Sequence, residues 1–266
     1  MSPWLSLVAV MSAVAFPAAL AQDRPAQDHP AETDTVFLLH GLGRTPRSMN
    51  WLGERLASHG FRVINLSYPS TSHPMEKLAV EMRARLAVMS GTSSGRVHFV
   101  THSMGGIVLR AVLRESPPPN LGRVVMLCPP NQGSEVVDRL RGNPLFRWVT
   151  GPAGAQMGTD DASLPNCLGT VDFELGVITG NRTLNPLFSA WIPGPDDGKV
   201  SVRRAAVTGM KDFLVVPASH TFIMRHSSVA GQVAWFLQHG QFRRDPAPST
   251  GPLATATGIR KTPRNQ

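Results

Sequence analysis

The sequence predicts an α/β fold, with a mainly parallel sheet of about six strands and helices on both of its faces. Two observations predict it. From residue 35 onward, short and continuously apolar runs alternate with segments of helical periodicity, and such strands are typical of a parallel sheet covered on both faces. The 266 residues are 42% hydrophobic and 17% charged, which suits one domain with a substantial core.

The apolar runs place the strands and the periodic segments place the helices, in chain order. The first strand, TVFLLHG (35–41), ends in glycine, and the second covers 61–70. A helix is predicted over 74–89, because proline is accepted in a first turn and apolar residues then repeat every three or four positions. The further strands are expected at 96–103, 122–130, 173–180 and 212–218, and the further helices at 105–115, 133–142 and 227–240.

One long segment has no regular pattern. Residues 142–171 are rich in glycine and proline, and they are too few for a separate domain. We expect them to form a small lid or a loop wall. The predicted domain covers residues 35–240.

The N-terminus has the features of an export signal. Residues 1–21 run apolar from Trp4 to Leu20 and close on a small-residue cleavage pattern that ends at Ala21. No Lys or Arg leads the segment, so a membrane anchor or a buried helix is the competing interpretation. Pro17 and the polar linker at 22–34 favour cleavage near Ala21. We therefore expect an exported protein, periplasmic or secreted.

The formal charge of +8 is unevenly spread. Residues 241–266 hold five basic residues and one acidic residue, a net charge of +4, in a composition rich in Pro, Thr, Gly and Ala. This pattern predicts a disordered basic tail. Such a tail attracts anionic surfaces weakly, although a solvated tail without a partner is the simpler interpretation. Nucleic-acid binding is not expected, because the basic residues are not interleaved with aromatic ones.

Two cysteines, Cys128 and Cys167, leave two interpretations open. Export permits a disulfide between them, which would stabilise the fold by about 4 kcal/mol on the chain-entropy model. Two separate thiols fit the sequence equally well. No Cys or His spacing is typical of a metal site, and we expect neither a metal nor another cofactor.

The stretch GRVHFVTHSMGGIVLR (95–110) joins a buried strand to a helix through a serine. Its centre, from Thr101 to Gly105, differs at one position from Gly-x-Ser-x-Gly, the signature of a sharp turn that exposes a nucleophilic serine. Gly105 satisfies the downstream requirement for a small residue. Thr101 departs from the upstream one, but a β-branched residue is favourable at the end of a strand. Ser103 would then stand at the carboxyl edge of the sheet, although a simple helix cap is the competing interpretation.

With this motif the chain resembles the α/β-hydrolase family, in its exported lipase and esterase branch, over about residues 35–240. LLHGLGRTPRSM (38–49) is similar to the His-Gly loop after the family's first core strand. The resemblance implies that the backbone N–H groups of Leu42 and Met104 form an oxyanion hole, worth ~3 kcal/mol per donor. His40 would brace the loop. The chain reaches its first core strand almost at once, so the resemblance is to the compact hydrolases of about six strands.

The family's acid and base follow the serine in the order Ser, acid, His. PGPDDGKVSV (193–202) resembles the loop that carries the acid, which points to Asp197. Asp196 is the rival, and Glu174 and Asp172 are less suitable because they enter a strand.

VVPASHTFIM (215–224) resembles the loop that carries the histidine, which points to His220. His226 is the rival base, and His102 is expected to be structural. A serine hydroxyl needs an imidazole to accept its proton, and a carboxylate fixes the tautomer of that imidazole.

The resemblance implies a carboxylic ester hydrolase that works through an acyl-enzyme on a small-molecule or lipid ester. An acyltransferase with the same acyl-enzyme and a non-catalytic binding protein are the alternatives. Six apolar residues are candidates for an acyl-binding surface, although core packing is the better interpretation for most of them: Leu42, Met104, Met157, Leu187, Phe188 and Phe222.

Overall fold

The structure is a computed structural model that describes residues 33–244. The predicted export signal at 1–21, nearly all of the linker at 22–34 and most of the tail at 241–266 lie outside the described residues. No helix within the described part of the chain is long and apolar enough to cross a membrane.

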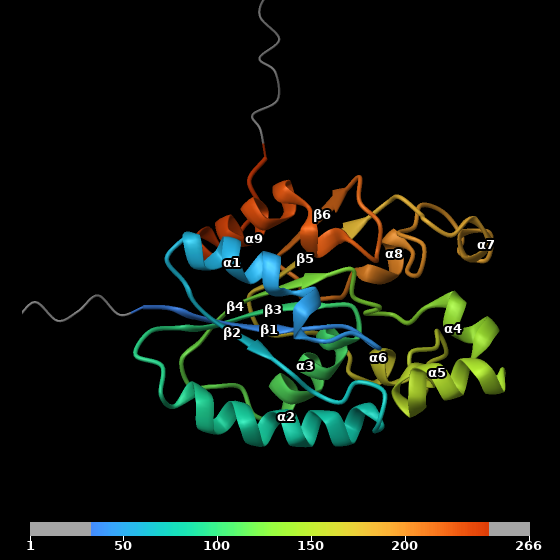
Figure 1. Cartoon of the computed structure of the whole chain (residues 1–266), viewed down its shortest axis with the longest axis horizontal. Coiled ribbons are helices and arrows are strands. Elements are labelled where there is room, and N and C mark those ends of the chain that lie inside the picture. Colours follow the sequence, from blue (N-terminus) through green and yellow to red (C-terminus); the bar gives the residue numbers. More distant parts are fainter. Residues whose placement is uncertain (1–32, 245–266) are drawn as a thin grey trace, which may run out of the picture. The chain divides into compact units, whose positions relative to one another are not determined.

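The described residues form a six-stranded sheet in which every neighbouring pair is parallel, so the predicted fold class is confirmed. The strand order is β2-β1-β3-β4-β5-β6 (Figure 1). The chain therefore runs outward in one direction from β1 to β2 and in the other from β3 to β6. Ligands bind at such a reversal point in open α/β sheets. The strands are β1 (Thr35–Leu39), β2 (Arg62–Leu66), β3 (Val97–His102), β4 (Leu121–Leu127), β5 (Leu175–Gly180) and β6 (Asp212–Val216).

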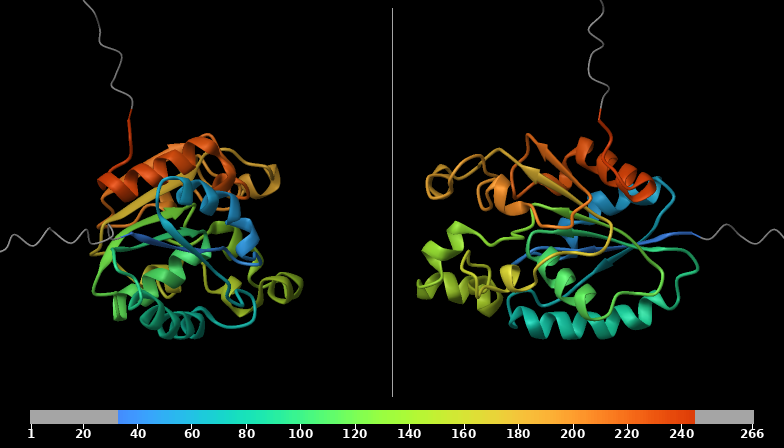
Figure 2. Two further views of the ribbon diagram at one scale, coloured as in Figure 1. Left: turned by 60° about the vertical axis from the view of Figure 1, so that its left-hand side comes forward. Right: turned by 180° about the vertical axis from the view of Figure 1, so that it is seen from behind.

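Alternate side chains of the central strands serve two separate cores. In β1, Phe37 and Leu39 join one apolar cluster, and Val36 and Leu38 join the other. Helices α2 (Met75–Ser90) and α3 (Met104–Glu115) cover the first face, and α1 (Asn50–Ser58) and α9 (Ser227–His239) cover the second (Figure 2). The continuous apolar runs of the sequence reflect burial on both faces.

The shorter helices gather beyond the carboxyl ends of the strands (Figure 1), the edge of the sheet at which Ser103 follows β3. The short helices are α4 (Glu135–Leu140), α6 (Leu164–Cys167), α7 (Pro186–Ser189) and α8 (Val202–Ala205), with 3-10 turns at Pro46–Ser48 and Ile223–Arg225. The sequence predicted α4, within 133–142, but neither α1 nor the three four-residue helices, which are too short for a measurable periodicity.

The segment 142–171 is more regular than its composition indicated. It contains α5 (Pro144–Ala155), which begins at an Asn143 side chain that accepts hydrogen bonds from the N–H groups of Leu145 and Phe146. Gly151, with φ of 65°, breaks this element into two half-helices. Each half is about two turns or less, and the Gly-Pro pair between them conceals the helical pattern in the sequence.

The packed chain extends past both predicted limits of the domain. Phe242 is buried against Phe236, and the Arg244 guanidinium pairs with the Asp212 carboxylate. At the other end, the Asp34 carboxylate accepts a hydrogen bond from the N–H of Arg96. Residues 33–34 and 241–244 therefore belong to the folded domain, whereas the sequence assigned them to the linker and to the tail.

The two cysteines are not bonded to each other. Cys128 is buried at the end of β4, and the thiol of Cys167 is exposed at the end of α6. Of the two interpretations that the sequence left open, the structure has the separate thiols.

Candidate active site

Ser103 occupies a strained turn between β3 and α3. Its φ of 53° lies in the left-handed region that non-glycine residues rarely adopt. The Ser103 N–H donates to the Leu127 carbonyl at the end of β4, at 2.8 Å. Gly105 lies so close to β1 that a Cβ there would be 2.7 Å from the His40 carbonyl oxygen. The downstream glycine of the motif is therefore needed for β1 and the turn to approach each other.

Thr101, the departure from the motif, is accommodated by a second glycine. Its side chain is buried, and a Cβ on Gly106 would be 3.1 Å from the Thr101 hydroxyl oxygen. The missing side chain of Gly106, in the first turn of α3, thus leaves the space that the threonine uses.

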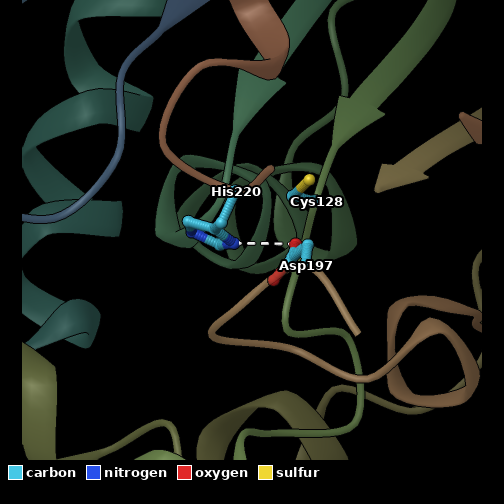
Figure 3. A group of neighbouring side chains, drawn as sticks. All are labelled: Cys128, Asp197 and His220. Atoms are coloured by element: carbon cyan, nitrogen blue, oxygen red, sulfur yellow. Dashed lines mark hydrogen bonds and ion pairs between the residues drawn. The ribbon is translucent and has the colours of Figure 1, made fainter. Parts of the chain in front are cut away.

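His220 and Asp197 meet Ser103 from two other strand ends. The Ser103 hydroxyl oxygen lies 3.0 Å from His220 Nε2, and His220 Nδ1 lies 2.9 Å from Asp197 Oδ2. Figure 3 shows the second of these bonds beside Cys128. A carboxylate only accepts hydrogen bonds, so Nδ1 carries the hydrogen and Nε2 is free to accept from the serine hydroxyl. The three residues follow β3, β6 and β5 respectively, so one edge of the parallel sheet brings them together.

The Asp197 carboxylate is almost completely buried and heavily hydrogen-bonded. Its Oδ1 accepts from the N–H groups of Lys199 and Val200 at 2.9 and 2.8 Å. Burial alone raises the pKa of this carboxyl, but the charge and the hydrogen bond of His220 outweigh burial and hold the pKa below its ordinary value. The His220 N–H also donates to the Asp197 carbonyl at 2.9 Å. Asp197 is therefore ionised at neutral pH and fixed relative to the imidazole.

Cys128 lies beside Asp197, which the sequence did not indicate. Its sulfur is within 4.8 Å of the Asp197 carboxylate, and its φ of 50° makes it, with Ser103, one of two non-glycine residues at positive φ within residues 33–244. Burial and then the charge of Asp197 raise the pKa of the thiol well above its ordinary value. Cys128 therefore stays protonated at neutral pH, with its thiol next to the carboxylate.

The ligand atoms of Cys128, Asp197 and His220 lie within 4.8 Å of one another, so we considered whether they fit a metal ion. Metals bind the thiolate and the neutral imidazole. Here the thiol is held protonated and the Nδ1 hydrogen is engaged with the carboxylate. The donor set fits an internal hydrogen-bond network better than a metal site.

Two further side chains brace the loops. His102 Nε2 donates to the His220 carbonyl at 2.9 Å, and burial lowers the pKa of His102 well below its usual value. His102 is thus a neutral support for the base loop. On the β1 side, the Tyr68 hydroxyl donates to the His40 carbonyl and its ring stacks on His40. Tyr68 gave no sequence signal, because a tyrosine after an edge strand belongs to no motif.

The rival residues have other partners. The carboxylate oxygens of Asp196 accept hydrogen bonds from the Ser189 hydroxyl and the Gly198 N–H. His226 bonds the Ser228 hydroxyl at the start of α9. Glu174 pairs with Arg123 and Lys211, and it precedes β5 at the sheet edge opposite to Ser103, as does the exposed Asp172. Within residues 33–244, none of these four residues forms a hydrogen bond or an ion pair with the side chain of Ser103 or His220.

Two backbone N–H groups near the serine donate no backbone hydrogen bond within the described part of the chain. The Met104 N–H opens α3, where the first N–H groups of a helix have no intrahelical acceptor. Neither it nor the N–H of Leu42, after β1, donates to a backbone carbonyl within residues 33–244. A helix N-terminus stabilises negative charge.

A pocket of about 430 Å³ opens onto Ser103 and His220. Of the six apolar residues considered from the sequence, Leu42, Met157 and Phe188 line it. Met104 is fully buried in the core, and Leu187 and Phe222 are 62% and 52% exposed outside the lining. The remaining wall comes largely from α4 and α5, with Val136, Val137, Leu140, Phe146 and Val149.

The model of the Alpha/beta hydrolase family matches residues 36–249, most of the chain. The chain belongs to the α/β-hydrolase family. The match covers the whole described sheet except Thr35, the first residue of β1, and all three of the loops that meet at Ser103.

Two cutinases are similar to part of this α/β hydrolase. Cutinase 2 of Thermobifida cellulosilytica and cutinase cut1 of Thermobifida fusca are each 37% identical over 90 residues, which is 29% of this chain. The similar stretch spans only 34% and 28% of the length of those two cutinases.

Solved structures of similar fold cover more of the chain at lower identity. The mature lipase BlEst2 of Bacillus licheniformis aligns with a TM-score of 0.58 and 19% identity, over 76% of this chain and 90% of its own. The phospholipase PlaB of Legionella pneumophila aligns with a TM-score of 0.64 and 16% identity, over 79% of this chain and 60% of its own. At these identities the likeness concerns the fold.

Proposed function

We propose that this α/β hydrolase cleaves carboxylic esters by a serine mechanism. The observation that carries the proposal is the pair of hydrogen bonds from Ser103 Oγ to His220 Nε2, at 3.0 Å, and from His220 Nδ1 to Asp197 Oδ2, at 2.9 Å. The partial similarity to cutinases supports an ester as the substrate.

In the first half of the reaction, Ser103 Oγ attacks the ester carbonyl carbon while His220 Nε2 takes the hydroxyl proton. Asp197 holds the imidazole in the required tautomer and stabilises the imidazolium that forms. The carbonyl oxygen becomes an anion, which the N–H groups of Leu42 and Met104 stabilise by ~3 kcal/mol each. Collapse of this intermediate expels the alcohol, which leaves with the proton from His220.

In the second half, water enters and His220 takes one of its protons. The hydroxide attacks the acyl-enzyme, the same N–H groups hold the second anion, and the acid is released as Ser103 regains its proton. The apolar wall that α4 and α5 supply suits an aliphatic acyl chain.

The test is a series of 4-nitrophenyl esters of increasing acyl length, hydrolysed by the wild type and by Ser103→Ala. We expect the variant to lose the activity by several orders of magnitude, and a fluorophosphonate probe to label only the wild type. Equal hydrolysis by both proteins, or equal labelling, would show that Ser103 is not the nucleophile.

We also propose that the protein is exported after cleavage near Ala21, on the basis of the apolar leader and its small-residue end. Expression in a bacterial host followed by N-terminal sequencing of the periplasmic and medium fractions tests this. The expected mature sequence begins at Gln22, and a protein that keeps Met1 in the cytoplasmic fraction would contradict export.

A further inference from the structure

The pocket beside Ser103 contains two cationic side chains without an acidic partner. Arg44 and Lys199 line it, and none of its lining residues is Asp or Glu. Neither side chain takes part in the ion pairs formed among residues 33–244. The carboxylate that interacts electrostatically with Lys199, that of Asp197, is buried and already bonded to His220. Arg44 is half-buried and Lys199 reaches solvent, so both positive charges are available to an anionic ligand in the pocket.

The backbone holds both cations close to the reacting groups. Arg44 follows Leu42 by two positions, and its N–H donates to the Gly41 carbonyl at 3.2 Å. Lys199 follows Asp197 by two positions and donates its N–H to the Asp197 carboxylate at 2.9 Å. Since two residues of backbone span at most about 7 Å, the two side chains begin near the oxyanion side and near the acid side of the site, and both line the pocket.

The environment of Lys199 favours a bound anion. Its side chain reaches solvent in the pocket, yet the surrounding protein partly desolvates the ammonium, and this together with the charge of Arg44 lowers the pKa of Lys199. Asp197 opposes the effect only in part. An anion placed between the two cations would offset both the desolvation and their mutual repulsion.

The other polar groups of the pocket are already used. The Ser134 hydroxyl donates to the Lys199 carbonyl at 2.6 Å, and the Thr150 hydroxyl donates to the Phe146 carbonyl at 2.7 Å. Apart from the reacting Ser103 and His220 and the bracing His102, the rest of the lining is apolar. The pocket therefore suits a ligand that has an apolar chain and one anionic group.

We propose that the natural substrate is an ester with a carboxylate or phosphate group, which Arg44 and Lys199 bind while Ser103 attacks the ester carbonyl. This rests on the proposed ester hydrolysis and narrows it to one class of substrate. A guanidinium binds either anion through two parallel N–H bonds, and the neighbouring ammonium adds a point charge.

The first experiment compares two matched substrates. One is the 4-nitrophenyl half-ester of a dicarboxylic acid, with a free carboxylate at its far end, and the other is the neutral 4-nitrophenyl ester of equal chain length. The wild type should prefer the anionic ester. In Arg44→Gln and in Lys199→Gln the ratio of the two kcat/KM values should fall about tenfold, as for loss of one charge-assisted hydrogen bond. Lys77→Gln, on the exposed side of α2 and outside the pocket, should leave the ratio unchanged.

A second arm distinguishes the two anions. Short-chain phosphatidic acid, below its critical micelle concentration, is compared with the diacylglycerol of equal chain length. A higher kcat/KM for the half-ester than for its neutral partner identifies a carboxylate, and a higher kcat/KM for phosphatidic acid than for diacylglycerol identifies a phosphate. If neither anionic substrate is preferred, the proposal is overturned. It is also overturned if Lys199→Gln slows neutral and anionic esters equally, because Lys199 would then act on the negative charge that develops on the ester carbonyl oxygen in every substrate.

A binding measurement keeps this proposal separate from the proposed function. In titration calorimetry, Ser103→Ala should bind decanoate or decyl phosphate with a lower Kd than decanol. Adding Arg44→Gln to that variant should remove the difference in Kd. Anion binding without ester hydrolysis by the wild type would overturn the proposed function and leave the anion site standing. Hydrolysis of neutral esters without anion binding would overturn only the anion site.

Discussion

Asp197 and Asp196 are adjacent carboxylates with different environments, which makes them a matched pair for mutation. Asp197→Asn keeps the shape of the side chain but presents an amide to His220, which favours the wrong tautomer of the imidazole. We expect kcat on a nitrophenyl ester to fall by about 10³–10⁴-fold, the loss seen for such a change in other serine enzymes. Asp196→Asn, whose partners are Ser189 and Gly198, should retain activity within a few-fold. Comparable losses in both variants would mean that the carboxylate bonded to His220 has no special role.

The Cys128 thiol is held protonated and its sulfur lies within 4.8 Å of the Asp197 carboxylate, so we expect it to position Asp197 as a hydrogen-bond donor. Cys128→Ala removes this donor, so we expect kcat to fall several-fold and the acid limb of the pH–rate profile to move to higher pH, because the carboxylate loses a stabilising bond. Cys128→Ser keeps a donor and should restore most of the loss. If the alanine and serine variants behave alike in kcat and in the pH profile, Cys128 contributes only packing.

The turn between β3 and α3 can be tested with two neighbouring glycines. A methyl group at Gly105 would meet backbone oxygens of His40 and Leu39 at 2.7 and 2.9 Å, whereas at Gly106 it would meet side chains at 3.1 Å. Both changes gain the same helix propensity, about 1 kcal/mol. We therefore expect Gly105→Ala to be less stable than Gly106→Ala by ~1–3 kcal/mol in urea unfolding, with a larger loss of kcat. Equal free energies of unfolding would show that β1 adjusts to the added methyl group.

Some helices and strands of this molecule are determined by their local sequence, and others depend on contacts with distant residues. The buried strands and the helices α2, α3 and α9 follow from apolar runs and periodicity, so their residues predict them within a few positions. Helix α5 does not follow from local sequence, because Gly151 and Pro152 break its helical pattern. Its position also depends on a distant residue, since the Thr71 carbonyl leaves no room for a side chain at Gly151. The pocket wall was therefore the least predictable part of the site.

The candidate site shows the same division. Ser103, Asp197 and His220 were predicted from short motifs and do meet in the structure, although their roles in catalysis stay predictions. Cys128 belongs to no motif. Arg44 and Lys199 lie inside two of the loops that resemble the family, at positions to which the resemblance assigns no role. Each is two positions from a predicted site residue, but that the two line one pocket with Ser103 is seen only after distant strand ends come together.

For the whole molecule, the buried histidines predict how stability depends on pH. Burial lowers the pKa of His40, His98 and His102, so the folded chain binds fewer protons than the unfolded chain, whose histidines titrate near pH 6.5. Their contribution is complete above about pH 6.5 and is lost as the pH falls below it. Between pH 7.5 and 5.5 we expect the free energy of unfolding to fall by up to about 1.4 kcal/mol per histidine. Urea unfolding at three pH values measures this, and a constant or rising free energy would contradict it.

The hydroxyl and the imidazole that touch at this site lie 117 positions apart in the chain, on loops that follow a central strand and the last strand. An incompletely folded chain, however much helix it contains, lacks the contact until β6 has docked. During refolding, turnover of an ester should therefore appear after the recovery of the far-ultraviolet circular dichroism signal. The time at which turnover appears would then report when β6 docks.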